Sequence, residues 1–310
     1  MIIIRMTGGL GNQMFQYALY LRLTSMGKTV KFDDISEYQQ DNARQIMLWA
    51  FGIDYPKADR DEINEVTDGS LKLSHRIRRK LFGRKSLEYH EKDCNFDENV
   101  LKKEPAYLTG YFQSEKYFEA VKTRVREAFT FQELIYRGLA EELKKSILAY
   151  RKRIEENTAV SLHIRRGDYL ENTQVYGGNC TESYYKAAVS YMEGRYPEAV
   201  FFVFSNDTEW AAEWLARNYP AGGQGSWNQK FVLVQGISEE KGYLDMMLMS
   251  LCKHHIVANS SFSWWGAWLS GNPEKAVAAP SNWFNNQKCR DIYTGEMIKI
   301  SPLGEVEERG

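Results

Sequence analysis

The residues best suited to chemistry in this chain form an arginine cluster directly after an apolar run. The run 159–164 contains His163 near its end and is followed by Arg165, Arg166 and Asp168. Arginine presents a planar fork of donors that fits phosphate oxygens without a metal ion. Adjacent arginines that leave a buried strand point in different directions, so one can bind a ligand while the other pairs internally with Asp168. The position after an apolar run favours phosphate binding over a purely structural Arg–Asp pair.

A second candidate anion site is the serine-rich segment that follows the short apolar run 256–258. It contains Ser260, Ser261 and Ser263 in front of a helix-forming stretch. Backbone N–H groups and hydroxyls at a helix N-terminus bind anions, whereas capping the helix needs only one serine. The three serines therefore modestly favour an anion site over simple capping.

Three further polar side chains could recognise a nucleoside. Asn206 and Asp207 follow the apolar run 199–204, where capping of the next helix and contact with a base or ribose explain them equally well. Asp245 interrupts an apolar helical stretch and would need a partner if it were buried. A nucleotide N–H group is one candidate partner, and a neighbouring arginine is the other.

The glycine-rich turn near the N-terminus allows a dinucleotide interpretation. Gly9 and Gly11 match the first two glycines of a dinucleotide-binding fingerprint, and Asp33 lies at a suitable distance for a ribose contact. Met14, however, occupies the third position, where close helix packing requires glycine. The other interpretation is a tight turn that directs the segment Asn12-Gln13 into a ligand cleft.

The elements that must position these side chains follow from an alternation of apolar runs and helix-forming stretches. Runs 2–6 and 29–32 flank one such stretch, which predicts a βαβ unit, and the alternation resumes after residue 159. We therefore expect the α/β fold class with two Rossmann-like domains, 1–155 and 156–310. Ligands bind outside the carboxyl ends of parallel strands, so the polar clusters predict a cleft between these domains.

Composition and charge exclude several classes of protein. The chain of 310 residues has 40 Lys and Arg against 41 Asp and Glu, which argues against a protein that wraps nucleic acid. Hydrophobic residues at 43% exclude a disordered chain. None of the four cysteines lies in a C-x-x-C pair, and the adjacent His254 and His255 diverge, so neither a disulfide framework nor a metal site is expected. Without a long apolar run or a secretory signal, the chain is predicted to be soluble, reduced and intracellular.

One segment departs from the neutral balance. Residues 71–86 contain seven Lys or Arg and no acid, and Leu73, Ile77 and Leu81 recur at every fourth position. This spacing predicts a basic amphipathic helix. Such a helix either rests peripherally on an anionic membrane at Leu71–Ser86 or is a solvated basic surface.

Five sequence blocks together resemble one known family. The blocks are 8–18 (GGLGNQMFQYA), 110–114 (GYFQS), 163–169 (HIRRGDY), 204–210 (FSNDTEW) and 259–268 (NSSFSWWGAW). In this order they resemble the bacterial α-1,2-fucosyltransferases of glycosyltransferase family 11. Each block alone would be only suggestive, but the combination is specific and spans nearly the whole chain.

The resemblance implies a GT-B fold and a metal-independent, inverting transfer of L-fucose from GDP-fucose to a β-galactoside, with no cofactor. By similarity, Arg165 would bind the β-phosphate, His163 would lie near the nucleotide and Asp245 near the guanine. The acceptor would be an oligosaccharide or a lipid-linked glycan precursor at the inner face of a bacterial plasma membrane. The candidate donor-binding residues from all these considerations are His163, Arg165, Arg166, Asn206, Asp207, Asp245, Ser260, Ser261, Ser263, Gly9 and Gly11.

An inverting transfer also needs a group that takes the proton of the attacking hydroxyl. Asp168 and Asn12 are the candidate catalytic residues besides Arg165, although Asp168 can be tied to Arg166 and an asparagine is too weakly basic to take the proton. A phosphate oxygen of the donor is the third possibility. Two other classes of function stay open, an oxidoreductase or epimerase that uses the Gly8–Gly11 turn and a carbohydrate-binding protein without catalysis.

Overall fold

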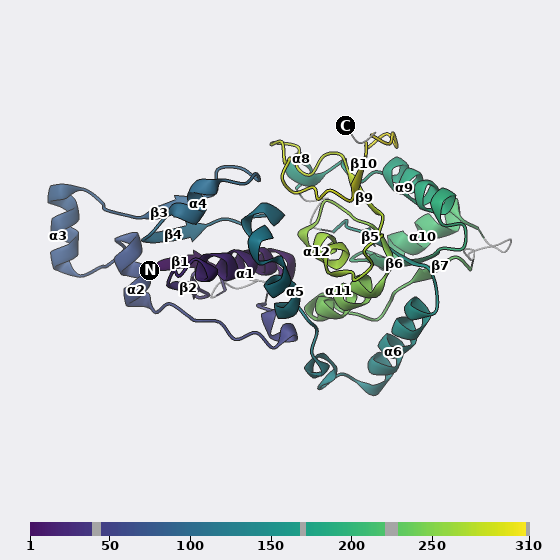
Figure 1. Ribbon diagram of the computed structural model, residues 1–310, viewed down its shortest axis with the longest axis horizontal. Helices are drawn as coiled ribbons and strands as arrows, with labels where there is room; N and C mark the ends of the chain where they lie inside the picture. The colour runs from purple at the N-terminus through teal and green to yellow at the C-terminus, as the bar shows by residue number, and fades with distance from the viewer. Residues whose placement is uncertain (39–44, 168–171, 221–228, 308–310) are drawn as a thin grey trace. The chain divides into compact units, whose positions relative to one another are not determined.

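Figure 1 shows the computed structural model, which describes residues 1–38, 45–167, 172–220 and 229–307. The chain forms two compact units. Unit 1 comprises residues 1–132 and 290–292, and unit 2 comprises residues 133–289 and 293–310. Each unit has its own parallel β-sheet, which confirms the α/β fold class with two Rossmann-like parts.

The long helix α6 (Glu141–Glu155) belongs to unit 2, although the sequence placed the domain junction at its end. It packs against α11 (Gly242–Leu251). The hydroxyl of its Tyr150 also donates to the backbone carbonyl of Leu233 (3.5 Å). The buried stripe of a helix ties it to the domain that covers the stripe, and a polar helical pattern does not reveal which domain that is. The units therefore divide after residue 132 rather than after residue 155.

Unit 1 is built on a four-stranded parallel sheet in the order β2-β1-β4-β3. Its strands are β1 (Ile2–Arg5), β2 (Val30–Asp33), β3 (Glu88–His90) and β4 (Ala106–Thr109). Its helices are α1 (Leu10–Ser25), α2 (Arg60–Thr67), α3 (Leu73–Phe82), α4 (Glu98–Lys102) and α5 (Lys122–Ala128), with short 3-10 turns η1 (Leu48–Phe51), η2 (Glu115–Tyr117) and η3 (Glu119–Val121).

Side chains of this sheet alternate between its two faces, as the two-residue period of a strand requires. Ile3 of β1 pairs in register with Tyr107 of β4, and both lie in a buried cluster with residues of α2. Ile4 pairs with Phe32 on the opposite face, where Tyr17 of α1 stacks on Phe32 with the ring centroids 6.2 Å apart. The sheet is therefore covered by α2 on one face and by α1 on the other.

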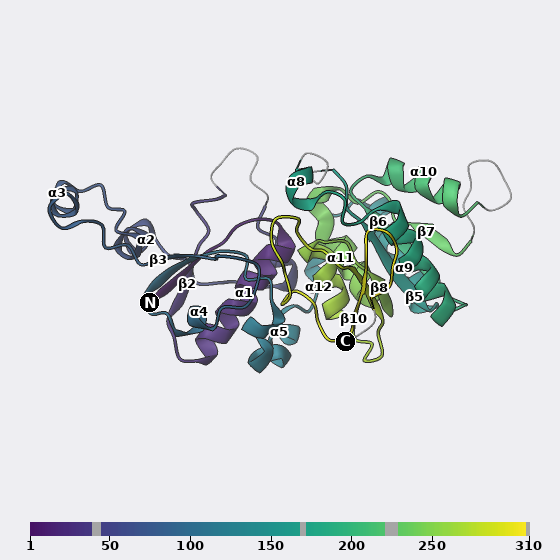
Figure 2. The ribbon, with the colours of Figure 1, turned by 90° about the horizontal axis from the view of Figure 1, so that it is seen from above.

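Unit 2 is built on a six-stranded parallel sheet in the order β10-β9-β8-β5-β6-β7. Its strands are β5 (Ala159–Ile164), β6 (Val200–Ser205), β7 (Phe231–Leu233), β8 (His254–Ile256), β9 (Val277–Pro280) and β10 (Met297–Ile300). Besides α6 and α11 its helices are α8 (Thr173–Tyr176), α9 (Glu182–Arg195), α10 (Thr208–Asn218) and α12 (Ser261–Leu269), with 3-10 turns η4 (Glu133–Tyr136) and η5 (Glu239–Lys241) (Figure 2).

The winding of unit 2 reverses between β5 and β8. From β5 the chain runs outward to β6 and β7, returns to β8 on the other side of β5, and then runs outward to β9 and β10. This is the doubly wound strand order of a Rossmann fold. Helices α9 and α10 bury one face of the sheet with Leu162 and Ile164, whereas His163 points to the opposite face and contacts the ring of Phe262 in α12.

The cysteines differ from the expectation of a fully reduced chain. Cys180 and Cys252 are free thiols, whereas Cys94 and Cys289 are disulfide-bonded. That expectation is therefore wrong for Cys94 and Cys289, because local spacing reports only on cysteines that are close in the sequence. In the part of the chain that the structure describes, no helix is both long enough and apolar enough to cross a membrane.

The packing of α12 on α11 depends on a glycine, which gives a test of the fold. A Cβ added at Gly266 would lie 2.9 Å from the Cβ of Met249, closer than two carbons can pack. We expect Gly266→Ala to lower the free energy of unfolding by about 1–3 kcal/mol, because overpacking outweighs the gain in helix propensity. Urea denaturation followed by circular dichroism measures this change.

Gly194 in α9 is the matched control. A Cβ added there meets no atom within 4 Å. Gly194→Ala should therefore show the propensity gain alone and raise the free energy of unfolding by up to about 1 kcal/mol. Equal stabilisation by both substitutions would contradict the close approach of α11 and α12.

Candidate functional site

The ends of β5 and β8 lie side by side where the winding of unit 2 reverses. Leu162 of β5 pairs with Ile256 of β8, and β6 flanks β5 on its other side. Because these strands are parallel, the residues that follow them emerge at one edge of the sheet, which is where doubly wound folds bind ligands. This edge therefore carries the arginine cluster after β5, the Asn206-Asp207 pair after β6 and the serine segment after β8.

Arg165 is the more buried arginine of the cluster. Its side chain is 14% exposed, and its Nη2 lies 3.8 Å from Oε1 of Glu239, whose side chain is 70% exposed. Glu239 begins η5, the turn that leads into α11. A mostly buried guanidinium beside an exposed carboxylate can exchange that carboxylate for phosphate oxygens and keep its charge balanced. Arg165 is therefore suited to bind an anionic ligand.

Arg166 is held within unit 2 by three contacts. Its backbone N–H donates to Oδ1 of Asn206 (2.9 Å), its Nε donates to Oδ2 of Asp207 (3.3 Å), and its guanidinium lies over the ring of Trp210, 4.1 Å from the centroid. Asp207 also caps α10 by accepting from the backbone N–H of Trp210 (3.1 Å). The internal partner of Arg166 is thus Asp207. Asp168, the partner expected from the sequence, lies outside the described residues.

The three serines have different surroundings at the start of α12. Ser260 is the N-cap residue, and its hydroxyl accepts from the backbone N–H of Phe262 (3.3 Å). Ser263 is buried, and its hydroxyl donates to the carbonyl of Ser260 (3.4 Å). Ser261 is half-buried in the first turn. A helix N-terminus offers backbone donors and the positive end of the helix dipole, so this turn is suited to an anion, with Ser261 as the serine best placed to contact it.

Asp245 is the only charged residue of α11. Burial raises its pKa to about 8. A carboxyl group with this pKa is mostly protonated at neutral pH, and N–H donors that hydrogen-bond its ionised form would lower the pKa again. The edge of a guanine presents such donors, so Asp245 is chemically matched to a guanine base.

The histidines of unit 2 are buried in strands of its sheet, and two of them form hydrogen bonds there. His163 is buried at the end of β5. Nδ1 of His255 shares a hydrogen bond with the hydroxyl of Ser161 (2.8 Å), and Nδ1 of His254 accepts from the backbone N–H of Ala276 (3.1 Å). Burial lowers the pKa of His254 to about 4 and that of His255 well below its usual value. No group of three or more metal-ligating side chains that could hold an ion occurs among the described residues.

In unit 1 the strands β1 and β4 are neighbours in the sheet, and their carboxyl ends lie at the same edge. There the glycine turn after β1 meets the loop after β4. Nε2 of Gln16 donates to the carbonyl of Gly110 (2.9 Å), and Nε2 of Gln113 donates to Oδ1 of Asn12 (2.8 Å). Gly8 has φ +77°, and a Cβ there would lie 2.5 Å from Nδ2 of Asn12, so only glycine fits. These contacts fix the partly exposed amide of Asn12 at the end of the sheet.

Gln13 does not point toward a ligand. Its side chain is fully buried. Its Nε2 donates to the carbonyls of Gly8 (2.9 Å) and Gln45 (3.0 Å), and its Oε1 accepts from the backbone N–H of Met47 (2.9 Å). The expectation that it faces a cleft is therefore wrong, because a helix turns successive side chains by about 100° and directs Gln13 into the core.

The surroundings of Asp33 weaken the dinucleotide interpretation. Its carboxylate accepts from the hydroxyls of Ser36 and Tyr107 (2.6 Å each) and from two backbone N–H groups of the following turn (3.0 Å each). Although burial raises it, the pKa of Asp33 lies below its usual value because of these bonds. Four donors saturate a carboxylate and leave no acceptor for a ribose. Gly9 is the N-cap of α1, and Gly11 is buried in its first turn.

Glu91 is a residue that the sequence analysis did not single out. Its two oxygens accept from the backbone N–H groups of Tyr111 (2.7 Å) and Phe112 (2.9 Å). Phe112 has φ +54°, which is rare for a bulky residue, so Glu91 braces a strained loop that carries Gln113. Burial raises the pKa of Glu91 to about 7. The charged three-residue strand β3 in front of it has no apolar pattern that could have pointed to this site.

The raised pKa of Asp245 predicts a pH dependence of stability. Because its pKa in the folded chain lies above the ordinary value of 3.8, ionisation opposes folding, and the cost grows as the pH rises from about 4 to about 8. We expect Asp245→Asn to become progressively more stable relative to the wild type across this range. Free energies of unfolding from urea titrations at pH 4, 6 and 8 measure the difference.

Asp54→Asn changes an exposed carboxylate and is the matched control. A difference between wild type and Asp245→Asn that stays constant from pH 4 to pH 8 would contradict the burial of the Asp245 carboxyl group.

Known proteins resemble this chain over most of its length. The sequence model of Glycosyl transferase family 11 matches residues 89–301. An Escherichia coli protein named alpha-1,2-colitosyltransferase is 32% identical over 298 residues, which cover 94% of this chain and 95% of that protein. The Escherichia coli O-antigen biosynthesis glycosyltransferase WbnK is 32% identical over 304 residues, which cover 92% of this chain and 96% of that protein.

A likeness also exists to a solved structure, an Arabidopsis thaliana FUT1 mutant in complex with GDP. It extends over 91% of this chain and 71% of that one, with 12% identity and a TM-score of 0.48. The family model spans more than half of the chain, and two relatives match almost all of it. The chain therefore belongs to glycosyltransferase family 11 and is an α-1,2-fucosyltransferase-like enzyme.

Proposed function

We propose that this enzyme transfers L-fucose from GDP-fucose to the 2-hydroxyl of a β-galactoside, with inversion and without a metal ion. The observation that carries the proposal is the arrangement at the switch point of unit 2. There the mostly buried Arg165 follows β5, and the N-terminus of α12 follows the neighbouring strand β8. Both features are of a kind that binds phosphate in proteins, and membership in the family adds the transfer of a sugar.

In the proposed complex, Arg165 binds the β-phosphate, Asp245 accepts from the guanine and His163 lies near the nucleotide. The first turn of α12 binds the diphosphate through its backbone N–H groups and Ser261. The full proposed donor set is His163, Arg165, Arg166, Asn206, Asp207, Asp245, Ser260, Ser261, Ser263, Gly9 and Gly11. Of these, Arg166 and Asp207 act by positioning, because they already bond to each other.

The proposed chemistry separates charge at the bond between the sugar and the diphosphate. As GDP leaves, negative charge develops on a β-phosphate oxygen while the sugar becomes oxocarbenium-like. A fixed guanidinium and oriented backbone donors stabilise such charge best when they are held in place before the reaction. Arg165 is held in this way by burial, and the first turn of α12 by its Ser260 cap.

Unit 1 takes the acceptor in this proposal. Asn12, fixed by Gln113, can orient a galactose hydroxyl but cannot take its proton. Asp168 is the proposed base. Glu91 is less suited to this step, because both its oxygens already accept backbone N–H groups. We place the reaction in the cytoplasm of a bacterium, on an oligosaccharide or a lipid-linked glycan precursor.

A second donor is favoured by one specific observation, the 32% identity to a colitosyltransferase. Colitose is fucose without its 3-hydroxyl. The two donors therefore differ by one hydrogen-bonding group, and a site that binds this hydroxyl would reject the analogue that lacks it.

Two other classes of function have less support. An NAD-dependent oxidoreductase or epimerase would need Asp33 for the ribose, and Asp33 is saturated by its own loop. A non-catalytic carbohydrate-binding protein would present aromatic platforms, yet Trp264, Trp265 and Trp268 are buried against one another.

The direct test combines the purified chain with GDP-fucose and each of three acceptors, namely lactose, Galβ1-3GalNAc and Galβ1-3GlcNAc, in excess EDTA. We expect GDP release and an α-1,2-linked product with at least one acceptor. GDP-colitose is assayed in parallel. A faster reaction with GDP-colitose than with GDP-fucose would identify colitose, rather than fucose, as the transferred sugar. Thermal stabilisation by NAD and not by GDP would refute the transferase proposal.

The role of Arg165 predicts a kinetic effect. We expect Arg165→Ala to lower kcat/KM by at least about 100-fold while the chain stays folded, because a preorganised cation at the leaving group contributes about 3 kcal/mol or more. Arg217→Ala removes an exposed arginine that pairs with Glu182 and is the matched control. More than a tenth of the wild-type rate in Arg165→Ala would remove Arg165 from this role.

The two carboxylates predict different kinetic effects. We expect Asp168→Asn to lower kcat by about 10²–10⁴-fold with little change in the Kd for GDP, as loss of a general base does. The isosteric Glu91→Gln should keep kcat within about tenfold. The reverse result would assign the base to Glu91, and full activity in both variants would leave the proton to a donor phosphate oxygen.

A further inference from the structure

Helix α3 of unit 1 presents its apolar side chains to solvent. Leu73 is 70% exposed, Ile77 51%, Leu81 69% and Phe82 74%, and no residue of the helix is buried. In Figures 1 and 2, α3 stands away from the sheet of unit 1, beyond α2 and β3. An amphipathic helix normally turns such residues toward a core. Their exposure here needs a physical reason.

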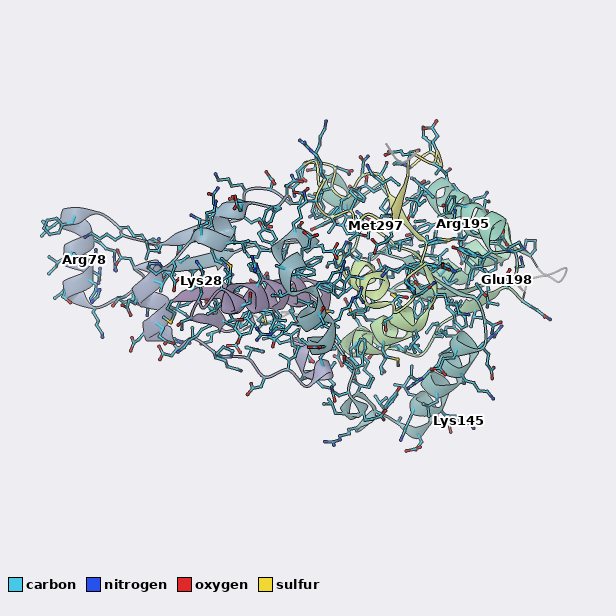
Figure 3. All side chains as sticks on the ribbon, in the orientation of Figure 1. Lys28, Arg78, Lys145, Arg195, Glu198 and Met297 are labelled. Carbon is cyan, nitrogen blue, oxygen red and sulfur yellow. The ribbon has the colours of Figure 1, made fainter. Side chains whose placement is uncertain are left out.

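The reason is that the arginine side of α3 is anchored to unit 1. Arg78 forms an ion pair with Asp68, and Arg79 donates to the backbone carbonyls of Asp68 (2.9 Å) and Ser70 (2.7 Å). The carboxylate of Asp68 also accepts from the backbone N–H of Lys85 (2.9 Å). Asp68 therefore contacts both α3 itself and the segment that follows it. These contacts fix the rotation of α3 about its axis. Figure 3 labels Arg78 on this helix.

Helix geometry then decides which side chains face outward. At about 100° per residue, Leu73, Ile77 and Leu81 form one stripe. Arg79 lies roughly opposite this stripe, and Arg78 lies beside it, about 100° from its centre. Arg76 and Lys80 are exposed and flank the stripe. The anchored helix thus presents a narrow apolar stripe edged by cations, which we call the α3 face (Leu73, Arg76, Ile77, Lys80 and Leu81).

Charge decides among the possible partners. Residues 69–87 contain seven Lys or Arg and no Asp or Glu. A second copy of the chain would bring two such segments together and be repelled. A nucleic acid would satisfy the cations but not three exposed apolar side chains. An anionic lipid bilayer satisfies both, because phosphates meet the cations at the depth where the apolar side chains enter the acyl boundary.

We propose that the α3 face docks the enzyme on an anionic membrane surface. Leu73, Ile77 and Leu81 enter the interface, and Arg76 and Lys80 contact lipid phosphates. This is peripheral attachment by one helix of unit 1, and it does not depend on which donor or acceptor sugar the enzyme uses. The proposed transfer reaction and this attachment can therefore fail independently.

The test is co-sedimentation of the full chain with vesicles. Vesicles of phosphatidylcholine with 30% phosphatidylglycerol, in ~50 mM salt, are compared with phosphatidylcholine alone and with the same anionic vesicles at ~500 mM salt. We expect binding to the anionic vesicles that weakens strongly with salt, and little binding to the neutral ones. Absence of binding to the anionic vesicles at low salt would overturn the proposal.

Two variants separate the charge contribution from the apolar one. Arg76→Glu with Lys80→Glu should lower the partition coefficient at least ~25-fold, since each cation near an anionic surface contributes about fivefold. Leu73→Ser with Ile77→Ser and Leu81→Ser keeps every charge and should lower it by about tenfold or more. Lys145→Glu with Lys152→Glu makes the same charge change on the exposed side of α6 and is the control.

Circular dichroism and transfer to a soluble acceptor verify that every variant is folded and active. Wild-type binding by the triple serine variant would overturn the proposal. It would show that the cations of α3 bind any polyanion and that the apolar side chains contribute nothing. Binding to heparin as tight as binding to anionic vesicles, unchanged in that variant, would lead to the same conclusion. Equal losses in the α6 control and the α3 charge variant would mean that net charge alone drives attachment.

Discussion

The direction of the parallel strands is the constraint on which the site of this enzyme depends. Parallel strands deliver all their carboxyl ends to one edge of a sheet, and right-handed crossovers place successive strands side by side. Where the winding reverses, two neighbouring strand ends diverge into helices on opposite faces and leave room for a ligand. In unit 2 this point brings residues about 95 positions apart in the sequence, after β5 and after β8, to one edge.

Charge balance then assigns roles to the side chains that arrive there. Arg166 is compensated by Asp207 and by the face of Trp210, so it stabilises the loop. Arg165 forms an ion pair with the exposed carboxylate of Glu239 at 3.8 Å, and a ligand phosphate could compete with that carboxylate. Asp245 shows the converse. Burial raises the pKa of its carboxyl group to about 8, and N–H donors from a ligand would favour its ionised form.

The same argument explains the unusual exposure of α3. An amphipathic helix turns its apolar stripe inward unless something stronger holds the opposite side. The carboxylate of Asp68 does this, because two arginines and a backbone N–H group of Lys85 all satisfy it. Those bonds hold the pKa of Asp68 at about 2, so the anchor persists at all physiological pH values. The apolar stripe is exposed because the arginines are held, and it is this exposed stripe that we propose as the lipid-binding surface.

By itself the sequence determined the α/β fold class, the polar clusters after strands 159–164, 199–204 and 256–258, and the family, because strand-and-helix periodicity and short motifs are local properties. Tertiary structure decided which clusters meet, since strand order is a long-range choice. In the tertiary structure Gln13 lies in the core, and Arg166 pairs with Asp207. Helix α6 belongs to unit 2, and Glu91 holds the loop after β4. These outcomes depend on which side of an element its neighbours cover, and no spacing in the sequence encodes that directly.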